Sequence, residues 1–271
     1  MTRKLSVAHL TAIDLPPPAL IEAAAEAGLD GVGLRLLRVT PDSPGYPLTA
    51  RADLQATRHA LQATGLKVAD VEFLRITPEF QLSEIAALLE VGAELGARHL
   101  ITAPYDDDLS RLSDSLSTVA EAADRHGMRA VLEFFPWTSV PDLATCWQVV
   151  QQAGPLPGIL LDTLHFDRSG STLADIARIP ADRFPFLHLA DAPRQDSYTT
   201  EELLDTARRQ RLIPGEGAID LAAILAALPA GQPIGLEIPD AAREGMPVAQ
   251  RLRLARQATL DLLARVDGPE A

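Results

Sequence analysis

The chain has 271 residues, 47% hydrophobic and 23% charged, a composition that excludes a disordered or fibrous chain. Its 24 basic and 37 acidic residues give a net charge of −13, which repels nucleic-acid phosphates and anionic lipid. The single cysteine, Cys146, excludes an intramolecular disulfide and a cysteine zinc cluster.

The remaining composition signals concern location. No apolar run approaches the roughly 20 residues of a membrane span. Residues 1–5 lead straight into a strand-like segment and carry no apolar signal core. We therefore expect a cytoplasmic protein that has no membrane and no nucleic acid among its partners.

Short apolar runs alternate with longer amphipathic segments along the chain, which predicts repeated strand–helix units. In chain order these are strand 5–12 and helix 18–27, strand 31–37 and helix 50–64, strand 67–76 and helix 82–95, strand 98–105 and helix 109–126, strand 129–136 and helix 142–153, strand 158–166 and helix 172–179, strand 184–193 and helix 219–227, and strand 234–240 and helix 248–266. Asp142 marks a helix start, while Gly65 and Gly127 mark helix ends.

Eight such units at roughly 30-residue spacing predict an α/β fold, a single (β/α)8 TIM barrel that forms one domain over residues 1–271. The alternative is an open doubly wound sheet. That alternative is weakened because no strand is followed by a GxGxxG turn or a GxxxxGK[ST] loop.

Four successive predicted strands carry a polar residue within an apolar run: Glu133, Asp162, His188 and Glu237. The first three are about one barrel repeat apart. Because the carboxyl ends of barrel strands meet at one face, we expect these four side chains to converge there. A satisfied polar group or a member of an ion pair is the alternative for each residue taken alone.

Three clustered carboxylates repel one another unless a cation lies between them, so the convergence predicts one divalent metal ion. An imidazole and three carboxylates form a hard donor set. This set favours Mn²⁺ first, with Mg²⁺, Co²⁺ or Zn²⁺ as alternatives.

Five further residues are candidate substrate contacts, with a packing or surface role as the alternative for each. His165 follows Asp162 by three residues, and Arg194 follows His188 by six. Trp137 could wall the pocket. Glu216 lies between two glycines in a turn that could pass beneath a ligand or merely cap the next helix, and Arg211 precedes that turn.

Charged residues also occur in the early strands. Arg35 and Glu72 could form an internal ion pair that supports the pocket, and Arg75 is the third such charge. The loops expected to determine substrate choice are residues 40–49 and 191–211.

These motifs resemble the sugar phosphate isomerase/epimerase family of the xylose isomerase-like TIM barrel superfamily. The resemblance covers nearly the whole chain and is most specific at residues 131–133, 161–165, 188–193, 214–217 and 236–237. It implies that His165 and Arg194 contact substrate. The metal ligands that it implies are Glu133, Asp162, His188 and Glu237.

The resemblance also implies a metal-dependent isomerase or epimerase that acts on a small keto-sugar or related polyhydroxy carbonyl compound through a metal-stabilised enediolate. Glu133 and Glu237 would act as paired acid and base, with His165 as a third catalytic group. Barrels of this type are often homo-oligomers, so a dimer or tetramer is expected.

Other activities within this superfamily stay open. They are a dehydratase of the 3-dehydroshikimate or inosose type, a subunit of a C-glycoside-cleaving lyase, and a barrel that has lost catalysis. The nuclease branch is disfavoured, because its trinuclear zinc cluster needs more histidines at strand ends than this chain offers, and because the net charge is −13.

Overall fold

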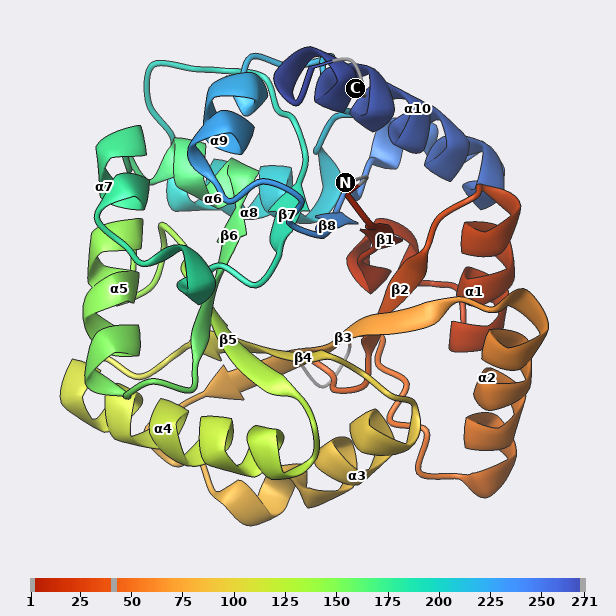
Figure 1. The fold of residues 1–271 in the computed structure, drawn as a ribbon, viewed down its shortest axis with the longest axis horizontal. Coiled ribbons are helices and arrows are strands. Elements are labelled where there is room, and N and C mark those ends of the chain that lie inside the picture. Colours follow the sequence, from red (N-terminus) through yellow and green to blue (C-terminus); the bar gives the residue numbers. More distant parts are fainter. Residues whose placement is uncertain (1–2, 40–42, 269–271) are drawn as a thin grey trace.

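The computed structural model describes residues 3–39 and 43–268, whose parallel strands close into a barrel in the order β1 to β8 (Figure 1). Strand β8 pairs with β1 and so completes the ring. The strands are β1 Leu5–Val7, β2 Gly31–Arg35, β3 Lys67–Ile76, β4 His99–Pro104, β5 Arg129–Glu133, β6 Gly158–Asp162, β7 Leu187–Leu189 and β8 Ile234–Leu236. The predicted TIM barrel is therefore confirmed.

An outer layer of helices surrounds the strands (Figure 1). The helices are α1 Pro17–Glu26, α2 Arg51–Thr64, α3 Ala86–Glu94, α4 Leu109–Arg125, α5 Leu143–Gln152, α6 Thr163–Arg168, α7 Leu173–Ala177, α8 Thr200–Arg209, α9 Leu221–Ala227 and α10 Val248–Val266. The Asp142 carboxylate accepts the Thr145 amide and caps α5, as predicted, while Gly65 ends α2 at a φ of 75°.

Several segments differ from the prediction. The expected strand 5–12 ends at Val7 and is followed by a 3-10 helix over His9–Ala12, and the expected strand 184–193 is reduced to Leu187–Leu189. The expected strand 158–166 ends at Asp162, because the Asp162 carboxylate accepts backbone amides of the next turn and starts α6. The expected loop 191–211 contains α8, which begins at a reciprocal capping box between Thr199 and Glu202.

Successive side chains along a strand point alternately into and out of the barrel, and the inward-pointing ones form an apolar layer. Ile101, Val131, Leu160 and Phe186, from β4, β5, β6 and the residue before β7, form a small buried cluster of their own. A larger apolar core lies between the strands and the helices. Since side chains two residues apart share a face, the residues two positions beyond this inner cluster also point into the barrel, towards its carboxyl end.

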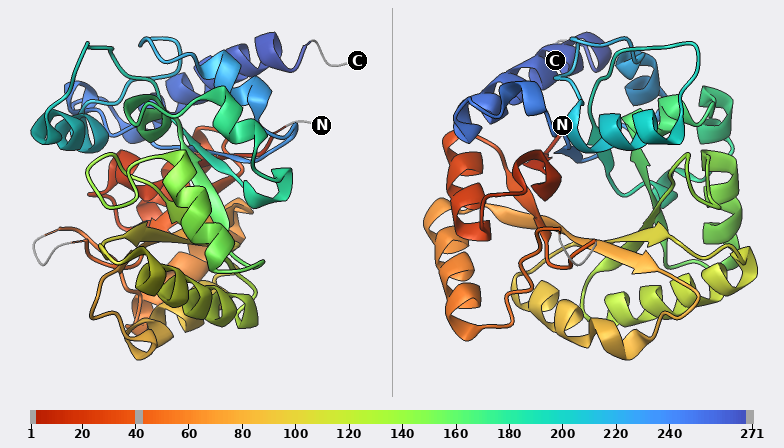
Figure 2. Two further views of the ribbon diagram at one scale, coloured as in Figure 1. Left: turned by 90° about the vertical axis from the view of Figure 1, so that its left-hand side faces the viewer. Right: turned by 180° about the vertical axis from the view of Figure 1, so that it is seen from behind.

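The two ends of the described chain meet at the amino end of the barrel. Arg3 and Asp267 form an ion pair of 3.0 Å between Nη2 and Oδ1, and both termini lie on the same side in Figure 2. Within residues 3–39 and 43–268, no helix combines the length and the apolar character that a bilayer span needs.

Candidate active site

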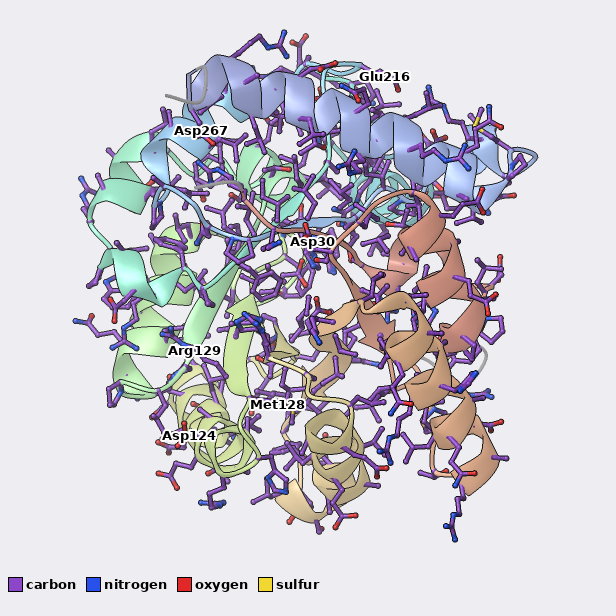
Figure 3. The ribbon with its side chains drawn as sticks, turned by 45° about the vertical axis from the view of Figure 1, so that its right-hand side comes forward. Asp30, Asp124, Met128, Arg129, Glu216 and Asp267 are labelled. Carbon is purple, nitrogen blue, oxygen red and sulfur yellow. The ribbon has the colours of Figure 1, made fainter. Side chains whose placement is uncertain are left out.

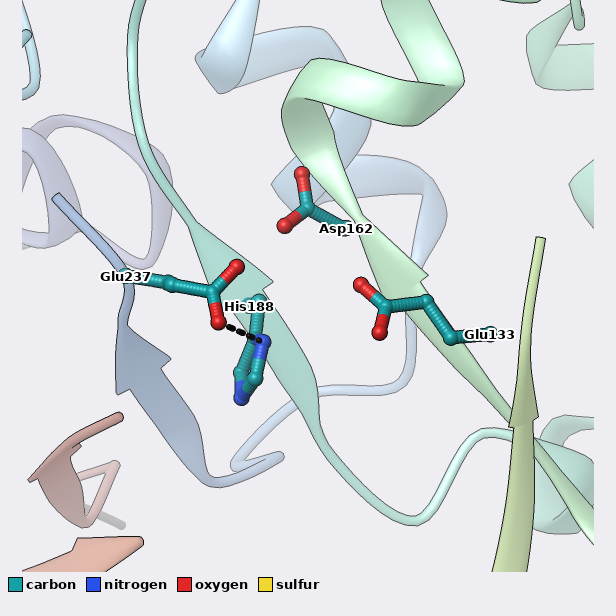
Figure 4. Close-up of side chains that lie close together, drawn as sticks. All are labelled: Glu133, Asp162, His188 and Glu237. Atoms are coloured by element: carbon teal, nitrogen blue, oxygen red, sulfur yellow. Dashed lines mark ion pairs between the residues drawn. The ribbon is translucent and has the colours of Figure 1, made fainter. Parts of the chain in front are cut away.

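The four candidate metal ligands converge at the carboxyl ends of neighbouring strands (Figure 4). Each has a ligand atom within 4.8 Å of those of the other three, and all four residues are buried. Glu133 and Asp162 are the last residues of β5 and β6, two positions beyond Val131 and Leu160. His188 lies in β7, two positions beyond Phe186, and Glu237 follows β8 directly. The strand period thus explains the convergence.

The His188 ring occupies space that a glycine leaves open. A Cβ atom on Gly235 would lie 2.7 Å from His188 Cδ2, so any other residue there would displace the ring. His188 Nδ1 lies 3.6 Å from Glu237 Oε1, an ion-pair distance longer than a hydrogen bond. Among the described residues, neither ring nitrogen has a hydrogen-bond partner, although the side chain is fully buried.

The Asp162 carboxylate is held on both sides. Its Oδ1 accepts the backbone amides of Leu164 at 2.7 Å and His165 at 3.3 Å. Its Oδ2 lies 2.5 Å from Arg211 Nη1, and Arg211 Nη2 lies 2.7 Å from Glu237 Oε2. Arg211 therefore bridges two of the three carboxylates.

The three carboxylates have unequal surroundings. Burial, and then the charges of Glu237 and Asp162, raise the pKa of Glu133 well above its ordinary value. Burial has the same effect on Asp162 and Glu237, but the Arg211 guanidinium and the His188 imidazole together outweigh it and hold the pKa of each below its ordinary value. For His188 burial alone would lower the pKa, but the carboxylates of Glu237, Glu133 and Asp70 together outweigh it and raise the pKa to about 10.

The donor set and its burial fit a divalent cation. Among the described residues no arginine pairs with Glu133, whose Oε1 lies 3.8 Å from Nε2 of the His165 imidazole. Three buried carboxylates, together with buried imidazole nitrogens that the described part of the chain leaves unbonded, are what a hard cation needs as ligands.

A cavity of about 230 Å³ opens onto these residues and is lined by Glu133, His165 and Glu237. Its other wall is largely aromatic, formed by Phe73, Tyr105, Phe135 and Trp137. Trp137 stacks on Phe135 and meets His165 edge-on, with ring centroids 5.3 and 5.2 Å apart.

Two unbonded donors lie at this aromatic wall. Among the described residues, Nε1 of Trp137 and Nδ1 of His165 are buried without a hydrogen-bond partner. Burial lowers the pKa of His165 to about 3, so this imidazole is neutral at pH 7 and can donate or accept a hydrogen bond. Both side chains are thus suited to contact a polar ligand.

Two predicted substrate contacts lie elsewhere. Arg194 is exposed and lines a separate surface cavity next to Arg168 and Tyr198. Glu216 lies at the periphery, where its carboxylate pairs with Arg243 at 2.8 Å (Figure 3). The structure therefore brings His165, Trp137 and Arg211 to the cavity and does not bring Arg194 or Glu216 there.

The turn around Glu216 is folded around a carboxylate of the same chain, that of Asp191. The buried Asp191 carboxylate accepts the backbone amides of Gly215 at 2.9 Å, Gly217 at 3.0 Å and Ile219 at 3.1 Å. A Cβ atom on Gly217 would lie 2.3 Å from Asp191 Oδ1, so glycine is required there. The unusual backbone path wraps a carboxylate of the chain itself.

Charges on early strands support the pocket from inside the barrel. Arg35 Nε lies 3.2 Å from Glu72 Oε1, which confirms the expected internal pair. Asp70, two residues before Glu72 on β3, is also buried, and burial raises its pKa to about 7. Sequence reasoning missed Asp70, although its period-two spacing from Glu72 was a signal.

The two loops expected to determine substrate choice both reach the cavity. In the loop 40–49, residues 40–42 lie outside the described residues, whereas Ser43 and Pro44 line the cavity. From the segment 191–211, Ala207, Arg208 and Arg211 line it, and the first two belong to α8.

A family model described as "Xylose isomerase-like TIM barrel" matches residues 21–258. The chain belongs to this family. The family predicted from the sequence motifs is therefore confirmed, and the fold and the convergent site agree with it.

Relatives within the xylose isomerase-like family carry different activities. A 3-dehydroshikimate dehydratase of Pseudomonas putida is 32% identical over 136 residues, 48% of this chain. That match spans only 21% of the dehydratase, so the chain covers about a fifth of that longer enzyme. An inosose isomerase of Bacillus subtilis is 22% identical over 198 residues, which cover 68% of this chain and 69% of that enzyme.

Among solved structures, the IolI protein with a bound zinc atom superposes with a TM-score of 0.80 over 97% of this chain and 99% of its own. Its sequence is 19% identical, so this likeness shows the shared fold.

Proposed function

We propose that the chain is a divalent-metal-dependent isomerase or epimerase of a small keto-sugar or related polyhydroxy carbonyl compound. The observation that carries this proposal is the convergence of Glu133, Asp162, His188 and Glu237 within 4.8 Å of one another, beside a cavity that Glu133 and Glu237 line. The relatives, among them an inosose isomerase and a dehydratase, support the same reaction class. The ion would be Mn²⁺, which this hard donor set favours.

The reaction would use the residues of the chain as follows. When bound, the ion would polarise a substrate carbonyl and make the adjacent C–H bond acidic. Glu133 and Glu237 face each other across the cluster and would remove and return the proton (Figure 4). Return to the opposite face of the same carbon gives an epimer, and return to the neighbouring carbon gives an isomer.

His165 and Trp137 would orient the substrate. The buried, unbonded N–H group of Trp137 and the buried, unbonded Nδ1 atom of His165 are suited to hydrogen bonding with a substrate hydroxyl group. Because burial lowers the pKa of His165 to about 3, its ring stays neutral and suits hydrogen bonding with the substrate better than proton transfer. Aromatic side chains around the cavity would exclude water from the reacting carbon.

A dehydratase acting on a cyclic hydroxy-ketone is the second candidate. The observation that favours it is the wall of Phe73, Tyr105, Phe135 and Trp137, against which a flat ring can pack. The same proton removal would begin this reaction, and loss of a β-hydroxyl would end it.

The test is solvent-deuterium exchange with protein first stripped by chelator and then loaded with Mn²⁺. Ketohexoses, hydroxypyruvate, inososes and 3-dehydroshikimate are each incubated in D₂O and followed by NMR. We expect deuterium to enter the carbon next to the carbonyl of at least one compound, with the Glu133→Gln variant as control. Loss of water with a new conjugated product would select the dehydratase. Binding of the ion without exchange in any compound would contradict both candidates.

The remaining features of the proposed enzyme are its domain, location and assembly. We propose that residues 1–271 form one barrel domain of a cytoplasmic homo-oligomer whose partner is a small molecule. Size-exclusion chromatography with light scattering measures the assembly state directly.

A further inference from the structure

Arg211 is a buried charged residue that lies among the candidate metal ligands. Its side chain is 1% exposed and is the largest of the fully buried side chains. Its guanidinium is fixed from behind, because Nε donates to the Ala207 carbonyl at 3.0 Å, and its backbone amide donates to the Pro239 carbonyl at 3.1 Å. This arginine is therefore held rigidly within the cluster.

The guanidinium occupies one oxygen of each of two carboxylates. Nη1 lies 2.5 Å from Asp162 Oδ2, and Nη2 lies 2.7 Å from Glu237 Oε2. Glu237 Oε1 is thereby left facing His188 Nδ1 at 3.6 Å. Such a two-pronged contact fixes the orientation of both carboxylates, which a point charge on a flexible stem would not do.

The charge of the cluster follows from these contacts. Three carboxylates carry a charge of −3 when ionised, and the permanently charged guanidinium of Arg211 reduces it to −2. With an ion bound, His188 would coordinate it as the neutral imidazole, which leaves that value unchanged. The cluster therefore has the charge that one divalent ion cancels, whereas a trivalent ion would leave an excess positive charge in a buried site.

We propose that Arg211 is a built-in counter-charge and positioning residue of the metal site. It keeps Asp162 and Glu237 together when no ion is bound, and it limits the site to divalent ions by lowering its negative charge to −2. This inference rests on the proposed metal function, and it concerns the selectivity of the site rather than the reaction.

The experiment compares Mn²⁺ and Tb³⁺ binding to the wild-type protein and to Arg211→Met, which keeps the side-chain bulk and removes the charge. Affinities are measured by isothermal titration calorimetry, and for Tb³⁺ also by luminescence. We expect the ratio of Tb³⁺ affinity to Mn²⁺ affinity to rise at least about tenfold in Arg211→Met, because the variant cluster attracts each additional positive charge more strongly. The two ions also differ in size. That difference affects the affinity ratio of the variant and of the wild type alike, so it does not contribute to the change in the ratio.

Two matched variants separate charge from structure. Arg211→Lys keeps the charge and loses the two-pronged contact, so its ratio should stay near the wild-type value. Arg3→Met removes another buried arginine, which pairs with Asp267 at the opposite end of the barrel, and should leave both affinities unchanged. We also expect the melting temperature of Arg211→Met to fall most in chelator and to recover when either ion is added.

The failures of the two proposals are distinguishable. A wild-type protein that binds neither ion would contradict the metal site itself. A wild-type protein that binds Mn²⁺, together with an Arg211→Met ratio equal to wild type, would overturn the role of Arg211. An Arg211→Met protein that stays unfolded at saturating Mn²⁺ and Tb³⁺ would also overturn it, since an added cation would then not replace the guanidinium.

Discussion

Arg35 Nε lies 3.2 Å from Glu72 Oε1, and both side chains are buried within the barrel. The contact is an ion pair without hydrogen-bond geometry, because both atoms lack a hydrogen-bond partner within residues 3–39 and 43–268. Glu72→Gln would leave the guanidinium buried without its counter-charge. We expect the free energy of unfolding to fall by about 3 kcal/mol, measured by urea denaturation in chelator.

A double variant tests the cause of that loss. Arg35→Met combined with Glu72→Leu removes both charges and should recover most of the stability lost in Glu72→Gln. A single variant within about 0.5 kcal/mol of wild type would show that the pair contributes little.

The proposed proton transfer makes Glu133 and Glu237 individually indispensable. Glu133→Gln and Glu237→Gln should each lower kcat by about 10²–10⁴-fold while the far-ultraviolet circular dichroism stays that of the wild type. Glu121→Gln, an exposed change on α4, is the control and should retain full turnover. Substantial activity in either variant of the pair would remove that residue from the proton transfer.

Metal removal should abolish activity and lower stability together. Chelator should stop turnover, and Mn²⁺ at about one hundred times its Kd should restore turnover and add about 2.7 kcal/mol to the free energy of unfolding. Asp162→Asn should lose both responses, whereas the exposed Asp124→Asn should keep them. Full activity in chelator would contradict the proposed cofactor.

Stability at low pH should depend on His99, the first residue of β4. Burial lowers the pKa of His99 to about 4, from 6.5 for an unperturbed histidine. Between pH 4 and pH 6.5 the unfolded chain binds a proton at His99 more readily than the folded chain does. The free energy of unfolding therefore keeps its full value above pH 6.5 and falls as the pH drops towards 4. The loss from this group is at most about 3 kcal/mol.

The contribution of His99 is isolated by comparison with a variant. His99→Gln keeps a hydrogen-bond donor near the Ala69 carbonyl, to which His99 Nδ1 now donates at 3.0 Å. Its unfolding free energy should decline less steeply between pH 6.5 and 4 than that of the wild type. If the unfolding free energies of the wild type and of His99→Gln changed in parallel with pH, His99 would be equally protonated in the folded and unfolded chains.

The candidate ligands were predictable because strand geometry is local. Glu133 follows Val131 and Asp162 follows Leu160 on the same inward face, so an acid in an apolar run already points to the barrel interior. The closing of eight strands into a ring then brings successive ends together. The two-residue period of the strands and the length of the strand–helix repeat can both be recognised in the sequence.

Helix α8 was missed for a physical reason. It has only three apolar residues, Leu203, Leu204 and Ala207, in a segment that is otherwise polar, so its apolar face is short and the segment resembles a loop. The available signal was the capping box formed by Thr199 and Glu202.

The position of Arg211 depends on contacts that are distant in sequence. Asp162 lies 49 residues before it. Two isolated β-bridges, Asp191 with Leu212 and Gln210 with Asp240, hold its segment against the barrel. No local pattern encodes such pairing, and the same holds for Arg194, which an extended stretch before α8 carries away from the cavity.

The apolar layer of Ile101, Val131, Leu160 and Phe186 blocks passage along the barrel axis beneath the acids. A substrate of the proposed enzyme would therefore reach the acids from the carboxyl end of the barrel, where the cavity lies, and its product would leave on that side. Accumulated product would then compete with substrate for the same cavity.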